Sequence, residues 1–296
     1  MDYPRFYDTT TTGTNYNKPN KLQYIRKLVG SQPRINLILL VLTLYTTWLV
    51  HGISYAITIV TILLSHEMGH FLMCRRYRIR ATLPFFIPLP IPYAAFNPFG
   101  TMGAVIRIEE RMPNRKALFD IGSAGPIAGL ILTIPALIIG LKLSTIVQVS
   151  SHSPFGLIIG DSLFFKALSF LIVGHVPDGY DIVLHPVAFA GWAGLFVTAL
   201  NLLPLGQLDG GHVVYAMFGP RTNVIYKIVL SLFIAVCVIY YQGWLFLILL
   251  LIWFGYRHPP PIDDFTPIDK RRRIIGYIIL FIFVISFTPV PFLFNN

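Results

Sequence analysis

The chain has 296 residues, of which 55% are hydrophobic and only 12% are charged, and its mean hydropathy is +0.66. These values exclude an ordinary soluble domain, and they indicate a protein that crosses a membrane several times. The formal net charge is +10. Because the basic residues gather in short stretches beside apolar segments, as in cytoplasmic loops, we read the charge as a topology signal and expect no nucleic acid partner.

Residues 1–34 are polar and end in a group of basic residues, which predicts a cytoplasmic N-terminal tail. Apolar segments separated by polar loops follow, so we expect one membrane domain over residues 35–296. The predicted fold is an all-α polytopic membrane protein with about six to seven transmembrane helices. The expected helices cover residues 35–50, 53–75, 117–141, 186–205, 224–241, 244–256 and 274–294.

Residues 82–103 are strongly apolar but contain five prolines, so they cannot form a regular spanning helix. We expect a re-entrant or interfacial loop there, because irregular backbone at membrane depth must be covered by protein or lined by water. The alternation of side chains over residues 101–108 then predicts a short strand. The expected membrane domain therefore includes one short membrane-associated strand and re-entrant loop region.

The strongest chemical signal is the sequence His66-Glu67-Met68-Gly69-His70, at the end of the second expected helix. Two histidines four residues apart project from one face of a helix, and this spacing, with the glutamate as base, is typical of zinc hydrolases. Four arginines between residues 75 and 80 mark the cytoplasmic side, so the motif lies just inside the membrane there. A catalytic zinc site also needs a third protein ligand.

Asp209 is the candidate for that third ligand. It ends an apolar segment that Pro204 and Gly206 interrupt, and an ionisable residue at membrane depth is costly unless it has a functional partner. For Asp209 to reach the histidines, the apolar residues 155–173 must not add a crossing, so we predict that they lie in the outer interface or fold back. The alternative interpretation of Asp209 is a simple helix cap.

The His-Glu motif and the later pattern Asn-x-x-Pro-x-x-x-Leu-Asp-Gly, which begins at Asn201, resemble the site-2 protease family of intramembrane zinc metalloproteases. The resemblance covers a core of residues 53–215 and is to the bacterial and chloroplast subgroup without a PDZ domain. The segments Asn-Pro-Phe-Gly-Thr at 97–101 and Gly-Ser-Ala-Gly-Pro at 122–126 are shared with that subgroup. The small residues of the second segment, with Gly129, also favour very close helix packing.

By position, the resemblance implies that His66, His70 and Asp209 hold one zinc ion per chain, with Glu67 and Asn201 as catalytic residues. For Asn201, a hydrogen bond between membrane helices is the alternative role. His212 lies one turn after Asp209 and could touch the site, although a loop histidine is its default interpretation.

The implied activity is hydrolysis of peptide bonds within or near transmembrane segments, in regulated intramembrane proteolysis or in the clearance of membrane peptides. The expected partners are a single-span membrane protein as substrate and the lipid bilayer, while the sequence carries no signal for an oligomeric state. The expected location is a bacterial inner membrane, with the active site near the cytoplasmic side. The alternatives are an inactive relative that binds membrane helices, which would be expected to lack Glu67 or a ligand, and a metal transporter, which would need polar groups leading to both faces.

Overall fold

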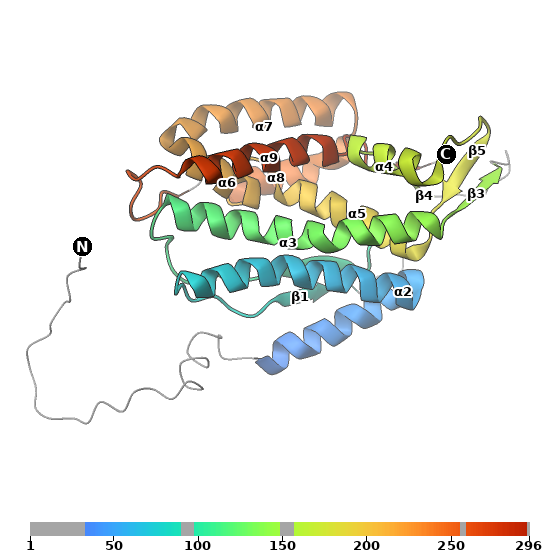
Figure 1. Ribbon diagram of the computed structural model, residues 1–296, viewed down its shortest axis with the longest axis horizontal. Coiled ribbons are helices and arrows are strands. Elements are labelled where there is room, and N and C mark those ends of the chain that lie inside the picture. The colour runs from blue at the N-terminus through green and yellow to red at the C-terminus, as the bar shows by residue number, and fades with distance from the viewer. Residues whose placement is uncertain (1–32, 90–97, 149–156, 255–258, 295–296) are drawn as a thin grey trace, which may run out of the picture.

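The computed structural model describes residues 33–89, 98–148, 157–254 and 259–294. These residues are mostly helical, and the helices lie roughly side by side along the long axis of the molecule (Figure 1). Nearly all of the expected N-terminal tail falls outside the described residues.

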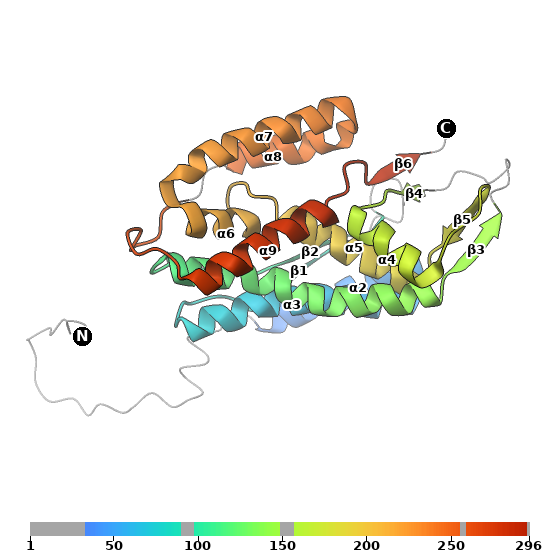
Figure 2. The ribbon, with the colours of Figure 1, turned by 45° about the horizontal axis from the view of Figure 1, so that its top comes forward.

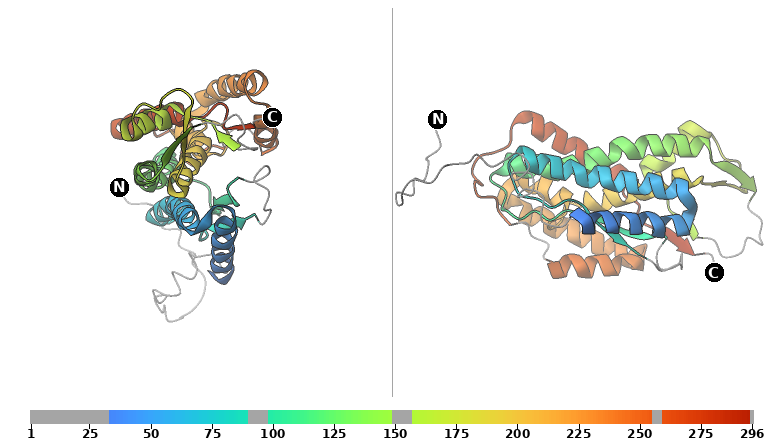
Figure 3. Two further views of the ribbon diagram at one scale, coloured as in Figure 1. Left: turned by 90° about the vertical axis from the view of Figure 1, so that its right-hand side faces the viewer. Right: turned by 90° about the horizontal axis from the view of Figure 1, so that it is seen from below.

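The first helix, α2 (Pro33–Arg76), consists of two apolar helices that meet at Gly52. Gly52 has a φ of 82°, a backbone conformation that glycine adopts without steric cost. The chain reverses direction there, so that the two halves of α2 lie side by side (Figure 3). The helices expected at 35–50 and 53–75 are therefore present. The second half carries the His-Glu motif into the interior, since Tyr55 and Ile59 on this half are buried.

The only strand expected from the sequence is present as part of an antiparallel pair. β2 (Thr101–Val105) pairs with β1 (Phe85–Pro88), and an isolated bridge between Ala81 and Ile108 extends the pairing. The side chain of Asn36 donates to the carbonyls that precede β1, which satisfies irregular backbone with a group from α2. Two of the five prolines, at positions 90 and 92, lie outside the described residues.

Two further helices complete the packed centre of the molecule (Figure 2). α3 (Arg115–Lys142) and α5 (Pro186–Asn201) contact each other and the second half of α2. The approach is close, because a Cβ added to Gly140 would lie 2.1 Å from the backbone nitrogen of Ala188. This packing confirms the helices expected at 117–141 and, over its first sixteen residues, at 186–205.

The segment between α3 and α5 stays at one end of the molecule. The backbone N–H of His185, which precedes α5, donates to the hydroxyl of Ser144, which follows α3, so the connection starts and ends at the same place. Within it, α4 (Leu163–Val173) has 11 residues, well short of the roughly 20 that cross a bilayer. The structure thus agrees with the prediction that this apolar stretch folds back, although residues 155 and 156 lie outside the described part.

Two small strand pairs cover that same end of the molecule. β3 (Thr145–Gln148) pairs with β5 (Tyr180–Val183), and β4 (Leu157–Ile159) pairs with β6 (Phe292–Phe294), both antiparallel. The second pair joins segments more than a hundred residues apart in the sequence, which local sequence patterns do not reveal.

After α5, the chain forms α6 and a helical hairpin. Figure 2 shows the hairpin on the side of the molecule away from α2 and α3. Its turn lies at Gln242 and Gly243, as predicted. The elements are α6 (Asp209–Phe218), the 3-10 helix η1 (Gly219–Arg221), α7 (Thr222–Ile239), the 3-10 helix η2 (Gln242–Trp244) and α8 (Leu245–Phe254).

The prediction for the last helix is wrong at its end. α9 (Lys270–Ser286) ends eight residues before the predicted boundary at 294, and the chain continues as β6. Pro289 and Pro291 explain the difference, because proline cannot continue a helix and disfavours helical backbone in the residue before it. The indole N–H of Trp244 donates to the carbonyl of Pro289 and fixes the non-helical segment.

By length and apolar composition, three helices of the described chain are candidates to cross a membrane. The expected count of six to seven spans is therefore not confirmed, because several expected spans are represented by helices of 10 to 17 residues. The candidates are Pro33–Arg76, Arg115–Lys142 and Asp209–Ile239.

An ionic cluster ties α9 to α3 near the C-terminal end of α2. The Arg272 guanidinium donates to both carboxylate oxygens of Asp120, over 2.7 and 2.6 Å, and the Tyr77 hydroxyl donates to the same carboxylate. Asp269 precedes α9 and accepts from the backbone N–H of Arg272, which holds the pKa of its carboxyl below the usual value. Asp269 also pairs with the Arg272 side chain.

We expect Arg272→Ala to lower the free energy of unfolding by about 1–2 kcal/mol, since it removes charge-assisted bonds that are partly exposed. Arg271→Ala is the matched control, because that arginine is exposed and is in no ion pair among the described residues. Thermal unfolding in detergent measures both variants, and equal melting temperatures for them would contradict the structural role of the cluster.

Candidate metal centre

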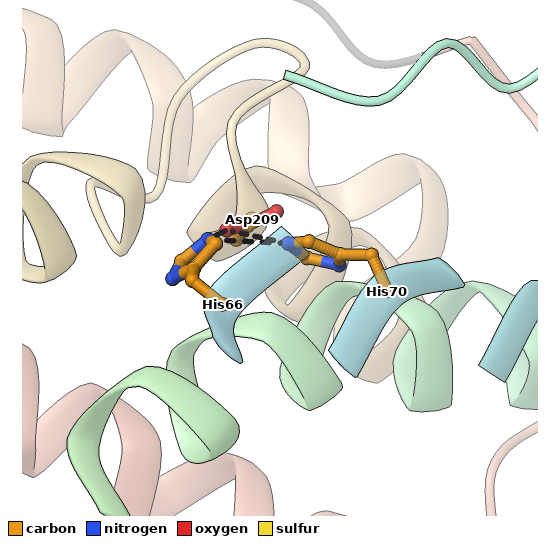
Figure 4. Close-up of side chains that lie close together, drawn as sticks. All are labelled: His66, His70 and Asp209. Carbon is orange, nitrogen blue, oxygen red and sulfur yellow. Dashed lines mark hydrogen bonds and ion pairs between the residues drawn. The ribbon is translucent and has the colours of Figure 1, made fainter. Parts of the chain in front are cut away.

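Three side chains that the sequence singles out converge at one point of the fold (Figure 4). His66 and His70 come from the second half of α2, and Asp209 is the first residue of α6. The Oδ2 atom of Asp209 lies 3.2 Å from Nε2 of His66 and 3.3 Å from Nε2 of His70, and the two Nε2 atoms are 3.2 Å apart. Among the described residues, His66, His70 and Asp209 form a group in which each side chain offers one ligand atom to a metal ion.

The spacing of the three atoms fits zinc. With zinc–nitrogen and zinc–oxygen bonds of about 2.0–2.1 Å, the edges of a ligand tetrahedron measure roughly 3.3–3.4 Å. The observed triangle has edges of 3.2 to 3.3 Å. Two imidazoles and one carboxylate also form a donor set found in catalytic zinc sites, which leave a fourth position open.

The position of Asp209 does not fit the helix-cap interpretation. The N-cap of α6 is Leu208, and no side chain caps this helix end. The Asp209 carboxylate instead interacts with the two histidines, although its position in the first turn also places a negative charge at the positive end of the helix dipole. The sequence predicts this meeting of Asp209 with the histidines on the condition that residues 155–173 add no membrane crossing, and the structure shows it.

The orientation of His70 is fixed by a backbone group. Its Nδ1 lies 2.7 Å from the carbonyl oxygen of Ile121 on α3, which accepts the Nδ1 proton. This bond leaves Nε2 without a proton and free to coordinate, an arrangement common among metal-binding histidines. Ile121 has no chemically reactive side chain, so no sequence signal identified it.

Glycines of α3 form the surface on which the histidines lie. A Cβ on Gly125 would lie 2.0 Å from His70 Nε2, and one on Gly129 would lie 3.2 Å from His66 Nδ1. On the same face, a Cβ on Gly122 would lie 2.6 Å from the Cβ of His212. The small residues therefore do allow close helix packing, as predicted, and what they pack against is the candidate metal centre.

Glu67 lies beside the three converging residues in a cavity of about 240 Å³. The cavity is also lined by β2 and the residues that follow it, and the main chain of Ile106 is within hydrogen-bonding reach of the Glu67 carboxylate. Glu67 is 8% exposed, so its carboxylate acts in surroundings with little water. The geometry places one carboxylate next to the three converging side chains and a strand in the wall of the same cavity.

Asn201 and His212 also line this cavity. The Nδ2 atom of Asn201, at the end of α5, lies 3.2 Å from Nε2 of His66, so Asn201 faces the site. His212 lines the cavity too, but its Nδ1 lies 3.0 Å from the carbonyl oxygen of Leu208, and it does not belong to the group of three.

Comparison with known proteins gives the family. The model of "Peptidase family M50" matches residues 54–240. A chain from Arabidopsis thaliana named "Probable zinc metalloprotease EGY1, chloroplastic" is 31% identical over 250 residues, which are 81% of this chain and 43% of that protein. The rice protein of the same name (Oryza sativa subsp. japonica) is 34% identical over 178 residues, 57% of this chain and 28% of its own length.

"Probable zinc metalloprotease EGY2, chloroplastic" from Arabidopsis thaliana is 27% identical over 259 residues, 83% of this chain and 43% of that protein. The chain thus spans less than half the length of these curated relatives. No solved structure matches it. The chloroplast names give no support to the bacterial inner membrane predicted from the sequence. The matched region contains both motifs, and the chain belongs to peptidase family M50, the site-2 protease family.

Proposed function

We propose that this chain is an intramembrane zinc metalloendopeptidase that hydrolyses peptide bonds within or near transmembrane segments of membrane proteins. The observation that carries the proposal is the triangle of His66, His70 and Asp209 with Glu67 in the same cavity. The apolar helices around it support a site at membrane depth, and the printed names of the relatives support zinc.

Zinc bound by these three residues would supply Lewis acidity, which polarises a scissile carbonyl and makes water acidic enough to lose a proton near neutral pH. Glu67 accepts that proton as general base when the water oxygen attacks the carbonyl carbon. The protonated Glu67 then donates the proton to the leaving nitrogen as the carbon–nitrogen bond breaks. Burial of Glu67 keeps competing water away from this transfer.

A helical substrate must unwind before attack, because its carbonyls are hydrogen-bonded within the helix. We propose that the unwound segment adds as a strand to β2, on the edge opposite β1. The Arg107 N–H donates to the hydroxyl of Thr82, on the β1 side. Since N–H directions alternate along a strand, those of Ala104 and Ile106 point to the other edge, where the catalytic cavity lies.

Strand addition gives a specific test of β2. Ala104→Pro removes a donor from the free edge, and we expect it to raise KM strongly, whereas Arg107→Pro would break the bond to Thr82 and disturb the β1 side instead. Unchanged KM in Ala104→Pro, measured in detergent with a single-span substrate, would contradict strand addition.

Two alternatives receive less support. An inactive helix-binding relative has no need of Glu67 or of three converging ligands, and all four residues are present. A metal transporter needs a polar path to both faces, but in the described part of the chain the region next to the triangle, around Ile59 and Leu63, is apolar. We therefore keep a single-span membrane protein as the substrate class, in regulated proteolysis or peptide clearance. The apolar helices support a membrane as the location.

The proposed function is tested by cleavage of a purified single-span substrate in water labelled with oxygen-18. Hydrolysis predicts one labelled oxygen in the new carboxyl terminus, detected by mass spectrometry, and loss of cleavage with a zinc chelator. Cleavage that persists in full after complete removal of zinc would contradict the proposal.

Asn201 has a proposed role of its own, as a donor to the oxyanion that forms during attack. We expect Asn201→Ala to lower kcat by about 10²–10³-fold while zinc content stays unchanged. Gln207→Ala is the matched control, because it removes another amide from the same cavity and should have a small effect. A loss of stability without a fall in kcat would assign Asn201 to interhelical bonding instead.

A further inference from the structure

A second cavity, of about 170 Å³, lies directly beside the catalytic one. It is walled by α2, β2 and α5, through residues that include Leu63, Met102 and Val197. Its lining is almost entirely apolar, whereas titratable side chains line the catalytic cavity. Met102 in its lining is 65% exposed, so one wall of the cavity lies at the protein surface.

The two cavities follow one another on three separate elements. On α2, Leu63 lines the apolar cavity and Glu67, one turn further, lines the catalytic one. On α5, Leu200 is followed directly by Asn201, and on β2, Gly103 is followed directly by Ala104, with the same division. The two cavities therefore adjoin one another on all three elements, and the apolar one is lined by residues of α2 that lie further from the arginines that end this helix.

The volume selects the kind of group that fits. An apolar protein cavity of about 150 Å³ accommodates benzene, whereas sites for drug-sized ligands measure roughly 300–1,000 Å³. A cavity of about 170 Å³ thus matches one apolar side chain of the size of leucine or phenylalanine.

We propose that this apolar cavity is a specificity pocket, which binds one leucine- or phenylalanine-sized side chain of the substrate. The proposal rests on the proteolytic function proposed above. Because a helix rises about 1.5 Å per residue, Leu63 and Ile59 lie roughly 6 and 12 Å along α2 from Glu67. An extended peptide advances about 3.3 Å per residue, so the bound side chain belongs to a residue two to four positions from the scissile bond.

The position of the pocket also determines on which side of the scissile bond the recognised residue lies. On α2, the pocket residues Leu63 and Ile59 lie further than Glu67 from the arginines that end the helix. Under the predicted topology, the recognised residue therefore lies on the membrane-interior side of the bond. The substrate class is then a membrane segment in which a medium-sized apolar residue occupies one of these three positions. The bound group is a substrate side chain, and occupation by a lipid or detergent chain is an outcome that the test separates.

The test varies the pocket and the substrate together. Single-span substrates carry Ala, Leu, Phe or Trp at each position within four residues of the scissile bond, and kcat/KM is measured for wild type, Val197→Phe and Val197→Ala. At one interior-side position we expect wild type to prefer Leu or Phe over Ala by about 10–200-fold. Val197→Phe fills the pocket and should abolish this preference, while Val197→Ala should shift it toward Phe and Trp.

Ile131→Phe is the matched control, since it adds the same ring on the exposed face of α3, where Ile131 is 63% exposed, and it should keep the wild-type preference. If both Val197 variants keep the wild-type preference while cleavage continues, the specificity pocket is wrong and the proteolytic function stands. If Glu67→Gln cleaves as wild type does, the proposed function itself fails.

A second measurement applies even where Val197→Phe fails to fold. Met102→Cys, in an inactive Glu67→Gln background, is tested for disulfide formation with substrates that carry one cysteine each. Crosslinks confined to the interior-side positions two to four residues from the scissile bond support the pocket. Crosslinks at none of these positions would overturn it.

Discussion

Glu67→Gln should abolish cleavage of a single-span substrate while the protein still binds zinc. Glutamine has nearly the same size and shape as glutamate, so the packing beside His66 and His70 and the shape of the cavity are preserved. It cannot accept a proton from water, however, and general acid–base groups contribute about 10²–10⁴-fold to the rate. We therefore expect kcat to fall by at least about 10²-fold.

The control for this variant is Glu110→Gln. Glu110 pairs with Arg80 at the surface and does not line the cavity, so the control makes the same chemical change outside it. It should retain wild-type cleavage. Zinc content measured on all three proteins separates loss of the base from loss of the metal. Full activity in Glu67→Gln would show that the cleavage does not depend on this site, and it would contradict the proposed function.

Gly125→Ala should cost the protein its zinc. The added methyl group would lie 2.0 Å from Nε2 of His70, the atom proposed to hold the metal, and 2.5 Å from two further ring atoms. Either His70 leaves its position, or α3 moves away from α2 and takes the Ile121 carbonyl with it. Both outcomes break the triangle, so we expect loss of metal and of nearly all cleavage.

Gly129→Ala provides a graded comparison on the same helix face. There the methyl group would lie 3.2 Å from Nδ1 of His66, a contact that a small shift relieves. We expect a mild loss of zinc affinity and partial activity. We expect zinc content and cleavage, both measured in detergent, to decrease in the order wild type, Gly129→Ala, Gly125→Ala. Equal zinc content and cleavage in the two variants would contradict the packing shown by the structure.

Much of the candidate site could be predicted because ionisable residues are rare in apolar membrane segments and are usually functional there. The i to i+4 spacing of His66 and His70 fixes their common face whatever the rest of the fold does. Asp209 could be predicted only from the topology. It meets the histidines only if the segment before α5 returns to the end of the molecule at which α3 ends. The bond between His185 and Ser144 shows that return.

The groups that hold the site in place could not be predicted in the same way. The Ile121 carbonyl belongs to the backbone, and a side-chain pattern carries no information about it. The small residues of α3 indicated close packing, but the sequence does not say which helix face they meet. That Gly125 lies against His70 depends on how two helices fifty residues apart are placed.

The fold shows the same division. Helices with long apolar runs and the strand at 101–108 follow local patterns, and these are present. The last helix ends at Ser286 rather than near 294, and β6 pairs with β4 instead, because distant strand pairing competes with local helix propensity where prolines weaken the helix. The predicted six to seven membrane crossings are not confirmed for a related reason, since several apolar segments form short helices.

The measurement that tests the central claim most directly is the zinc content of purified wild type and Asp209→Ala, taken together with cleavage of one single-span substrate. Asp209 comes from a different helix than the histidines, so it tests whether α2 and α6 form one site. We predict about one zinc per chain and cleavage in wild type, and loss of both in Asp209→Ala. Full zinc content with undiminished cleavage in Asp209→Ala would contradict the account.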